Sequence, residues 1–284
     1  MGNLVMKRRS NSCRWLRFLL LALLPVLSSG GGPLPVPGPG TGVGPGVESR
    51  VEPQADVLLR RMGAFLGQQP FFSVNAEIWQ DSNLWSGQRV QSGRNVMIQI
   101  RRPNRFRAEM RSTRRSRGLI YDGKSLTLVD RVGNYFGTIP APALMDEALD
   151  VAVRQFGISL PLEDFIVLDP YQSAMRQVTS GVYIGPVTVL GVPCEHLAFS
   201  QGSIDWQVWI QEGPVPVPRK VVITYKDEVG APQYTAILSG WDFSNLPPDV
   251  LFVFEPTQGI TKIPVAEIRS QSRSLESNSI PNKP

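Results

Sequence analysis

The order of apolar and polar residues predicts a helix near the start of the folded part of the chain. Apolar side chains recur there at intervals of three and four residues, so they share one face of a helix. They are Ala55, Leu58, Leu59, Met62, Phe65 and Leu66. Pro53 suits the first turn of a helix, and Gly67 suits its end. We therefore predict an amphipathic helix from Pro53 to about Gly67.

Beyond this helix the period changes to two, which is typical of half-buried strands. Apolar and polar residues alternate from Val74 to Trp79, from Asn95 to Ile100 and from Arg105 to Met110. Closely spaced turn signals between such segments indicate an antiparallel meander. They are Ser86-Gly87, Pro103-Asn104, Asp122-Gly123 and Gly133-Asn134. Strands and helices do not alternate, so a parallel sheet is not expected.

A second helix is predicted from Leu144 to Phe156, with Pro142 near its start and Gly157 at its end. Its apolar residues form one broad face, and acidic residues lie opposite. Leu162 to Tyr171 adds a short apolar stretch, after which strands resume. The later strands are Val182 to Leu190, Cys194 to Ser200, Ile204 to Ile210, Arg219 to Lys226 and Tyr234 to Trp241.

These elements predict an α+β fold with one large antiparallel sheet of about ten strands and two or three helices on one side of it. So few helices cover a large sheet only if the sheet curves strongly around them. Either such a sheet closes on itself, or it curves around the helices on its concave face and leaves an apolar cavity at the mouth. The candidate cavity residues are Ile98, Ile100, Phe106, Met110, Leu144, Met145, Leu149, Trp206 and Val208.

Composition divides the chain into four parts. Residues 1–30 have a basic start, an apolar run from Phe18 to Leu27 and small residues after it, which is typical of a cleaved Sec-type signal peptide. The apolar run is too short for a transmembrane helix, and no cysteine marks a lipidation site. Residues 31–52 are rich in glycine and proline and predict a linker, residues 53–265 a single domain, and residues 266–284 a flexible polar tail. We expect a periplasmic protein without a mature transmembrane segment.

The net charge of +5 belongs to the leader. Five basic residues and no acid lie within residues 1–30, so 29 − 5 = 24 basic residues face 24 acidic ones in the rest of the chain. A neutral body without a stacking or zinc motif does not predict nucleic-acid binding. One cysteine and one histidine beyond residue 30 exclude internal disulfides and multi-thiolate zinc sites. No metal or cofactor is expected.

Eight arginines and a single acid, Glu109, lie between Arg101 and Arg117. Alternate positions on the strand from Arg105 to Arg111 share one face, so this charge projects from one side of the sheet. A solvated face is the ordinary interpretation. The alternative is a docking surface for an acidic envelope protein or for anionic headgroups, because arginine pairs well with planar anions. Its candidate residues are Arg105, Arg107, Arg111, Arg114, Arg115 and Arg117.

Cys194 and His196 share a strand face, and a turn near Gln201-Gly202 would place Asp205 on the same face of the next strand. Three interpretations stay open for this polar cluster. A buried thiol beside a hydrogen-bonded histidine is the common structural outcome. A metal or redox contact and a thiol nucleophile oriented by Asp205 are the alternatives.

Two segments resemble known families. Leu119 to Leu126, which includes Tyr121-Asp122-Gly123-Lys124, looks like a hairpin of the periplasmic outer-membrane lipoprotein carriers (LolA/LolB-like), and Val208 to Ile223 is similar to their later hairpin. Gly191 to Ala198 with Asp205 to Ile210 resembles a bacterial family of predicted periplasmic proteins of unknown function that is grouped with those carriers.

The resemblance covers about Val51 to Val265 and implies an open half-barrel with an apolar interior capped by helices. In the carriers that interior receives acyl chains. We therefore expect a non-enzymatic binding protein for a lipid, an acylated ligand or another hydrophobic ligand. An envelope sensor or scaffold that acts through the arginine-rich face, or makes transient contact with an anionic membrane surface, is the alternative, and a thiol enzyme at Cys194 is a weaker one.

Overall fold

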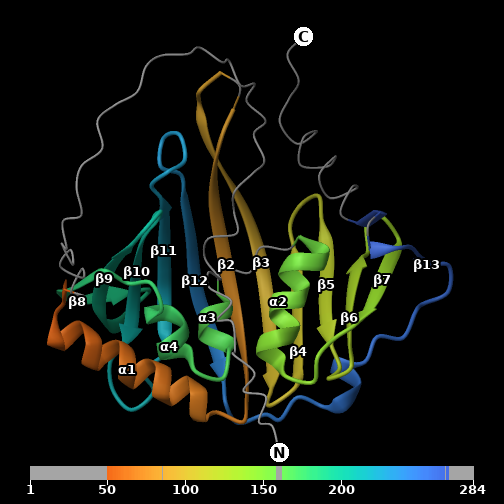
Figure 1. Ribbon diagram of the computed structural model, residues 1–284, viewed down its shortest axis with the longest axis horizontal. Helices are drawn as coiled ribbons and strands as arrows, with labels where there is room; N and C mark the ends of the chain where they lie inside the picture. The colour runs from red at the N-terminus through yellow and green to blue at the C-terminus, as the bar shows by residue number, and fades with distance from the viewer. Residues whose placement is uncertain (1–49, 85, 158–161, 266, 269–284) are drawn as a thin grey trace, which may run out of the picture.

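One open sheet dominates the computed structural model, which describes residues 50–84, 86–157, 162–265 and 267–268. The order of its strands is β1-β8-β9-β10-β11-β12-β2-β3-β4-β5-β6-β7-β13 (Figure 1). All pairings are antiparallel except two short parallel ones at the edges, β1 with β8 and β13 with β7. The α+β class and the unclosed antiparallel sheet are confirmed. The strand number is corrected, since 13 strands replace the expected ten or so.

One half of the sheet runs from β1 through β8 to β12. The bounds of its strands β8 to β12 agree with the predicted bounds to within about two residues at each end. The bounds in this half are β1 Arg50–Val51, β8 Ser180–Val189, β9 Val192–Gln201, β10 Ile204–Gln211, β11 Pro218–Tyr225 and β12 Gln233–Asp242. Residues 50 and 51 belong to the predicted linker. They nevertheless form the short strand β1, because Arg50 and Val51 pair with Ser180 and Gly181. The predicted signal peptide, the rest of the linker and nearly all of the tail lie outside the described residues.

The other half of the sheet begins with two long strands that pair along their whole length. Its bounds are β2 Phe71–Asn83, β3 Arg89–Arg101, β4 Arg105–Arg111, β5 Ser116–Tyr121, β6 Ser125–Asp130, β7 Tyr135–Pro140 and β13 Thr261–Lys262. Strands β2 and β3 are longer than the alternation predicts because their paired ends carry polar residues on both faces. Figure 1 shows this pair rising beyond the helices.

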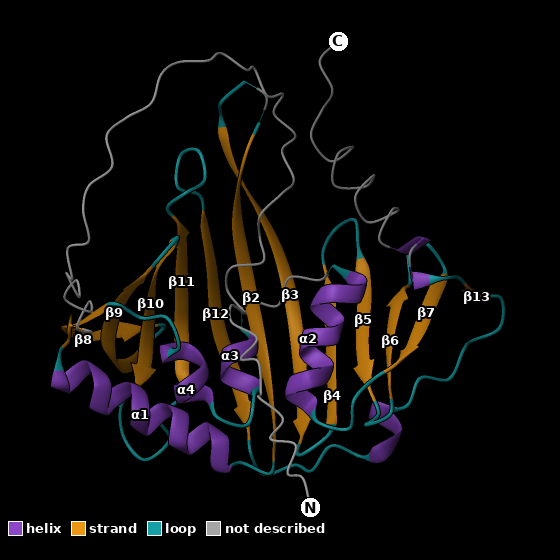
Figure 2. Ribbon diagram, in the orientation of Figure 1, coloured by secondary structure: helices purple, strands orange, loops and turns teal. Residues whose placement is uncertain are grey.

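In the described part of the chain, the helices α1 to α4 lie against one face of the sheet (Figures 1 and 2). They are α1 Pro53–Gln68, α2 Met145–Phe156, α3 Glu163–Ile166 and α4 Pro170–Met175, and a 3-10 helix, η1, spans Asp249–Phe252. Two or three were expected, and the apolar stretch after Leu162 provides the additional ones. Gly67 does not end α1 as predicted. It lies inside the helix, where the carbonyl oxygen of Leu168 approaches to 3.1 Å from the position of the missing Cβ.

The main core lies between the concave face and the helices. Residues directly opposite each other on antiparallel strands project from the same face. Ile98 therefore lies beside Ala108, and Ile100 beside Phe106, all on the concave side. The apolar stripes of α1 and α2 pack against this wall. The sheet and the helices thus bury one continuous core.

The segment 249–260, which we call the strap, covers part of the opposite, convex face. Phe254 of the strap packs against Phe136 of β7 with ring centroids 4.9 Å apart. Ile260 joins the same small cluster with Ile120 and Val129. The strap thereby closes the convex side of strands β5 to β7.

Candidate functional site

Seven of the nine predicted cavity residues lie in the apolar layer between the sheet and the helices. Each has at most 7% of its surface exposed, and all belong to one core cluster: Ile98, Ile100, Phe106, Met145, Leu149, Trp206 and Val208. Leu144 is a correction, because it is the residue before the first turn of α2 and is 48% exposed. Met110 is half-buried and lies higher on the concave wall, opposite Val96 and Arg117.

The near-zero exposure of these side chains shows that helix side chains fill the concave face. A residue lining an empty space of ligand size would keep accessible surface toward that space, whereas close-packed cores leave none. A pocket of about 210 Å³ does lie between α1 and the end of β10, near Leu58, Ile210 and Glu212. It is smaller than the roughly 300–1,000 Å³ of typical ligand sites. A ligand that reaches the seven buried wall residues would have to displace the helix side chains that pack on them.

Helix α1 is locked to α4 by close backbone approach. A Cβ atom on Gly63 would lie 2.7 Å from Cβ of Tyr171 and 2.8 Å from its backbone nitrogen. Asp56, Arg60 and Tyr171 form a polar clasp beside this contact. The Arg60 guanidinium lies 4.0 Å from the Tyr171 ring centroid and donates to its hydroxyl at 2.7 Å, and that hydroxyl donates to Asp56.

Arg102 holds the other end of α1. Its Nε donates to the carbonyl oxygen of Gln69 at 3.2 Å, and its Nη2 to that of Leu66 at 3.5 Å. These acceptors are carbonyls at the helix C-terminus, where a cation is favourable. Burial lowers the pKa of Arg102. Sequence analysis placed Arg102 only in the arginine-rich segment and missed this role, because the contact spans 36 residues of sequence.

Helix α2 is attached mainly through one apolar stripe. Met145, Ala148, Leu149, Ala152 and Phe156 are buried against the core, and Gly157 ends the helix with φ 65° as predicted. No side chain caps its N-terminus. Its Asp146 accepts a hydrogen bond from the backbone nitrogen of Leu168 at 3.2 Å.

The arginine-rich segment does not form one free surface. Arg105 and Arg107 lie on the convex side, but Arg105 donates to the carbonyl oxygen of Asn104 at 3.1 Å. Arg107 pairs with Glu109 at 2.6 Å and donates to the strap carbonyl of Leu251 at 2.8 Å.

Arg117 corrects the expectation of a single charged face, since it lies on the concave side and donates to Asp130 at 2.7 Å. Arg115 is half-buried, and its backbone nitrogen donates to Ser112. Arg111 and Arg114 are exposed. The candidate docking surface therefore narrows to Arg111 and Arg114.

Cys194, His196 and Asp205 share the convex face, as the strand register shows. No hydrogen bond joins any two of these three described residues. Nε2 of His196 forms a hydrogen bond with Oε1 of Gln207 at 3.0 Å. The imidazole ring stacks on the Trp209 ring, with ring centroids 4.1 Å apart. The Asp205 carboxylate accepts from Ser200 and from Lys226 instead.

Burial raises the pKa of the Cys194 thiol, and burial lowers the pKa of His196. A buried thiol of raised pKa without a contacting base is a poor nucleophile. This geometry favours the structural interpretation of the cluster. In the part of the chain that the structure describes, no group of three or more His, Cys, Asp or Glu side chains could hold a metal ion, and no helix has the length and apolar character to cross a bilayer.

Comparisons with known proteins identify a family. The model of a family described as predicted periplasmic protein (DUF2092) matches residues 55–266. No curated protein matches the chain. Among solved structures, an uncharacterized conserved protein from Thermus thermophilus is 13% identical with a TM-score of 0.44, and the match covers 74% of this chain and 99% of that one.

Two further solved structures are similar at low identity. The lipoprotein LppX of Mycobacterium tuberculosis is 9% identical with a TM-score of 0.41, over 67% of this chain and 96% of that one. A LolA superfamily protein from Nitrosomonas europaea is 10% identical with a TM-score of 0.38, over 70% and 97%. The family match covers most of the chain and confirms the resemblance seen in the sequence: this protein belongs to the DUF2092 family of predicted periplasmic proteins.

Proposed function

We propose that this protein is an exported, non-enzymatic binding protein that holds a lipid, an acylated ligand or another hydrophobic ligand on the concave face of its half-barrel. The observation that carries the proposal is the continuous apolar wall of the concave face, from Trp206 and Val208 on β10 to Leu126 on β6. Figure 2 shows the helices lying against this face of the sheet. Helix α2 is the cover that the ligand displaces.

The free energy that holds α2 on the wall and the free energy gained by burying an acyl chain there are of similar size. Burial of Met145, Leu149 and Phe156 stabilises docked α2 by about 5–9 kcal/mol, at about 1.5–3 kcal/mol for each large side chain. An acyl chain of about 16 methylenes gains about 13 kcal/mol on complete burial, at about 0.8 kcal/mol per methylene. A ligand with one long chain can therefore replace α2 on the wall, whereas a short-chain ligand cannot.

The compartment in this proposal is the periplasm, reached through a cleaved Sec-type signal peptide at residues 1–30 and a linker at 31–52. Support comes from the basic and apolar order of the leader and from the description of the family. The non-enzymatic assignment is supported by the separation of Cys194, His196 and Asp205, each of which has other partners.

Native mass spectrometry of the mature protein, purified gently from the periplasm, tests the proposal when combined with organic extraction and lipid analysis. We expect a stoichiometric adduct that extracts as a lipid. A bare mass that persists after incubation with membrane extract contradicts the proposal.

Two neighbouring positions on β3 provide a matched pair of variants. Ile98→Gln places a polar group on the concave wall, where the side chain is 7% exposed, and should reduce ligand occupancy at least about tenfold. Met97→Gln alters the convex face, where the side chain is 41% exposed, and should leave occupancy unchanged. Equal occupancy in the two variants would place the ligand elsewhere.

A second candidate function is docking to an anionic membrane surface through Arg111 and Arg114. Both side chains are exposed, and neither forms an ion pair with a carboxylate in the described chain. Cosedimentation with vesicles of about 30% phosphatidylglycerol tests it at low salt, where surface charges act most strongly. The double variant Arg111→Glu/Arg114→Glu should lose binding, while Arg50→Glu/Arg176→Glu, with the same change in net charge, should keep it.

A further inference from the structure

Arg94 lies on the concave face, directly above the apolar layer. The register of β2 and β3 places it opposite Ile78, and Val96 and Ile98 follow on the same face toward the core. This wall thus changes from buried apolar side chains at Ile98 to a half-buried cation at Arg94. Strands β2 and β3 extend beyond the helices (Figure 1).

The charge of Arg94 is not neutralised. Its Nη1 and Nη2 both donate to Oε1 of Gln80, at 3.1 and 3.2 Å, and this acceptor is neutral. No ion pair joins Arg94 to a carboxylate within the described ranges. Arg117, on the same face, differs because Asp130 neutralises it at 2.7 Å.

Two tyrosines lie beside Arg94. The guanidinium carbon is 5.9 Å from the ring centroid of Tyr234. Burial, followed by the charge of Glu228, raises the pKa of Tyr225 to about 12, although the positive charge of Arg94 opposes the shift. Burial also raises the pKa of Tyr234 far above its usual range. Neither phenol carries a negative charge at neutral pH, and Tyr234 is only 1% exposed, so Arg94 supplies the charge of this part of the wall.

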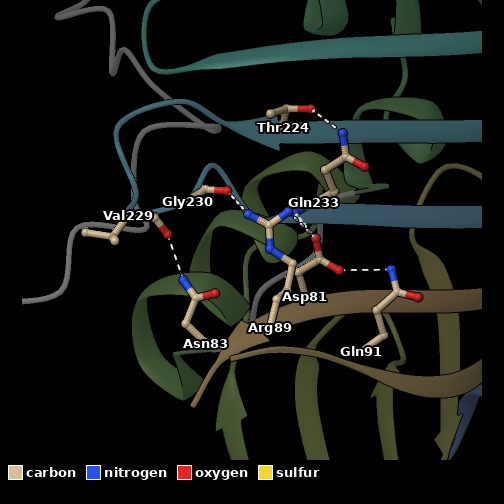
Figure 3. Close-up of polar contacts among 8 residues, drawn as sticks. All are labelled: Asp81, Asn83, Arg89, Gln91, Thr224, Val229, Gly230 and Gln233. Carbon is tan, nitrogen blue, oxygen red and sulfur yellow. Dashed lines mark hydrogen bonds and ion pairs between the residues drawn. The ribbon is translucent and has the colours of Figure 1, made fainter. Parts of the chain in front are cut away.

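A polar network on the convex side fixes this part of the wall (Figure 3). Asp81, next to Gln80, accepts from the side chain of Gln91 at 2.9 Å and from the backbone nitrogen of Gln233 at 3.0 Å. Arg89 donates to the carbonyl oxygen of Gly230 and pairs with Asp81 at 3.8 Å. Strands β2, β3 and β12 are thereby held together where Arg94 projects, and such support preorganises a binding side chain.

We propose that Arg94 binds the anionic headgroup, a carboxylate or a phosphate, of an amphiphilic ligand whose apolar chain occupies the concave wall. The inference rests on the proposed function and specifies its ligand class. A guanidinium fork matches planar or tetrahedral oxyanions, and a half-buried site strengthens the pairing relative to water. The anion replaces the neutral side-chain oxygen of Gln80 as acceptor and neutralises Arg94, which forms no ion pair with a carboxylate of the described residues.

The experiment compares three probes with the same chain: hexadecanoate, hexadecyl phosphate and hexadecanol. Dissociation constants are measured by tryptophan fluorescence below the micelle threshold. The wild-type protein should bind at least one anionic probe about 10- to 100-fold more tightly than the alcohol, the range expected for one charge-assisted pair. Whichever of the two anionic probes binds more tightly shows whether the preferred headgroup is a carboxylate or a phosphate.

Variants assign the preference to Arg94. Arg94→Gln should bind all three probes alike, and Arg94→Lys should keep part of the preference. Gln80→Glu should also abolish it, because the new carboxylate has nearly the same shape as the amide and neutralises Arg94 without removing it. Arg50→Gln is the matched control, since Arg50 is exposed on the edge strand β1, far from β3 in the sheet, and its loss changes the net charge equally.

A preference that survives in both Arg94→Gln and Gln80→Glu overturns the inference. A wild-type protein that binds the alcohol as tightly as both anions also overturns it but leaves the proposed function intact. If the wild-type protein binds none of the probes, the inference and the proposed function fail together.

Discussion

Helices α1 and α2 cover the same concave face but are attached to it in different ways. The backbone of α1 approaches α4 directly at Gly63, its clasp adds charged and aromatic contacts, and Arg102 binds its last carbonyls. Helix α2 is joined mainly through its apolar side chains. Under the proposed function, an apolar ligand replaces the contacts of α2, whereas the polar contacts of α1 keep that helix in place.

Hydrogen exchange should show the largest difference between the two helices. Local opening of α2 exposes three large apolar side chains, whereas opening of α1 also breaks the clasp and the contacts of Arg102. We expect the amides of α2 to exchange at least about 30-fold faster than those of α1, which corresponds to about 2 kcal/mol in the free energy of opening. Mass spectrometry of peptic fragments measures this. Equal protection of the two helices would show that they open as one unit.

Alanine substitution at two glycines of α1 should separate close approach from helix propensity. Gly63→Ala places a methyl group 2.7 Å from Cβ of Tyr171 and should lower the free energy of unfolding by about 1–3 kcal/mol, despite a gain of about 1 kcal/mol in helix propensity. Gly67→Ala is the control, because its nearest contact is 3.1 Å and its effect should stay within about 1 kcal/mol. Urea denaturation measures the free energy of unfolding of both variants. Similar values would show that α4 shifts to accommodate the methyl group at little cost.

Arg102→Met should loosen the end of α1. The two carbonyl oxygens of Leu66 and Gln69 lose a cationic donor, which lowers the free energy of unfolding by about 1–2 kcal/mol. Arg105→Met is the control, because the side-chain hydrogen bonds of Arg105 go to the adjacent Asn104, and it should change stability by less than about 0.5 kcal/mol. Unchanged stability in Arg102→Met would remove this contact from the attachment of α1.

The clasp should weaken in acid. The hydrogen bond from Tyr171, followed by that from Arg60, lowers the pKa of Asp56 below its usual 3.8, although burial opposes the shift. A carboxyl whose pKa is lower in the folded state stabilises the protein above its unfolded pKa, and this contribution is lost as the pH falls through the folded value. Wild type should therefore lose up to about 1 kcal/mol more than Asp56→Asn as the pH falls from about 5 through the folded pKa.

Thermal denaturation across this pH range checks the expectation. Tyr171→Phe should reproduce most of the loss of acid sensitivity, because the hydroxyl is the principal donor to Asp56. An identical acid dependence in all three proteins would show that Asp56 does not contribute to the clasp.

Alternation of apolar and polar residues predicted most of the sheet because a strand with one buried face must alternate. The same rule was insufficient at the paired ends of β2 and β3, where neighbouring residues such as Gln91 and Ser92 are exposed on both faces. The short helices α3 and α4 fall in an apolar stretch without a clear period. Burial on several sides, and not a single apolar stripe, determines them.

Parity correctly predicted that Ile98, Phe106 and Trp206 face the core. That they line a ligand cavity stays a prediction. Arg94 carries a signal that the sequence analysis did not use, since it has the same parity as Val96 and Ile98 but is charged. Arg117 was assigned to the wrong face because the turn before β5 changes which parity faces inward.

The sequence by itself determined the buried face of most strands and the two amphipathic helices, because these depend on the spacing of neighbouring residues, whereas the leader, the linker and the domain bounds stay predictions. The tertiary structure decided which arginines are neutralised and which helix is locked. Arg102 meets Leu66, and Asp56 meets Tyr171, across 36 and 115 residues. Such pairs depend on strand register and helix placement, which long-range packing sets, and no local pattern of residues encodes them.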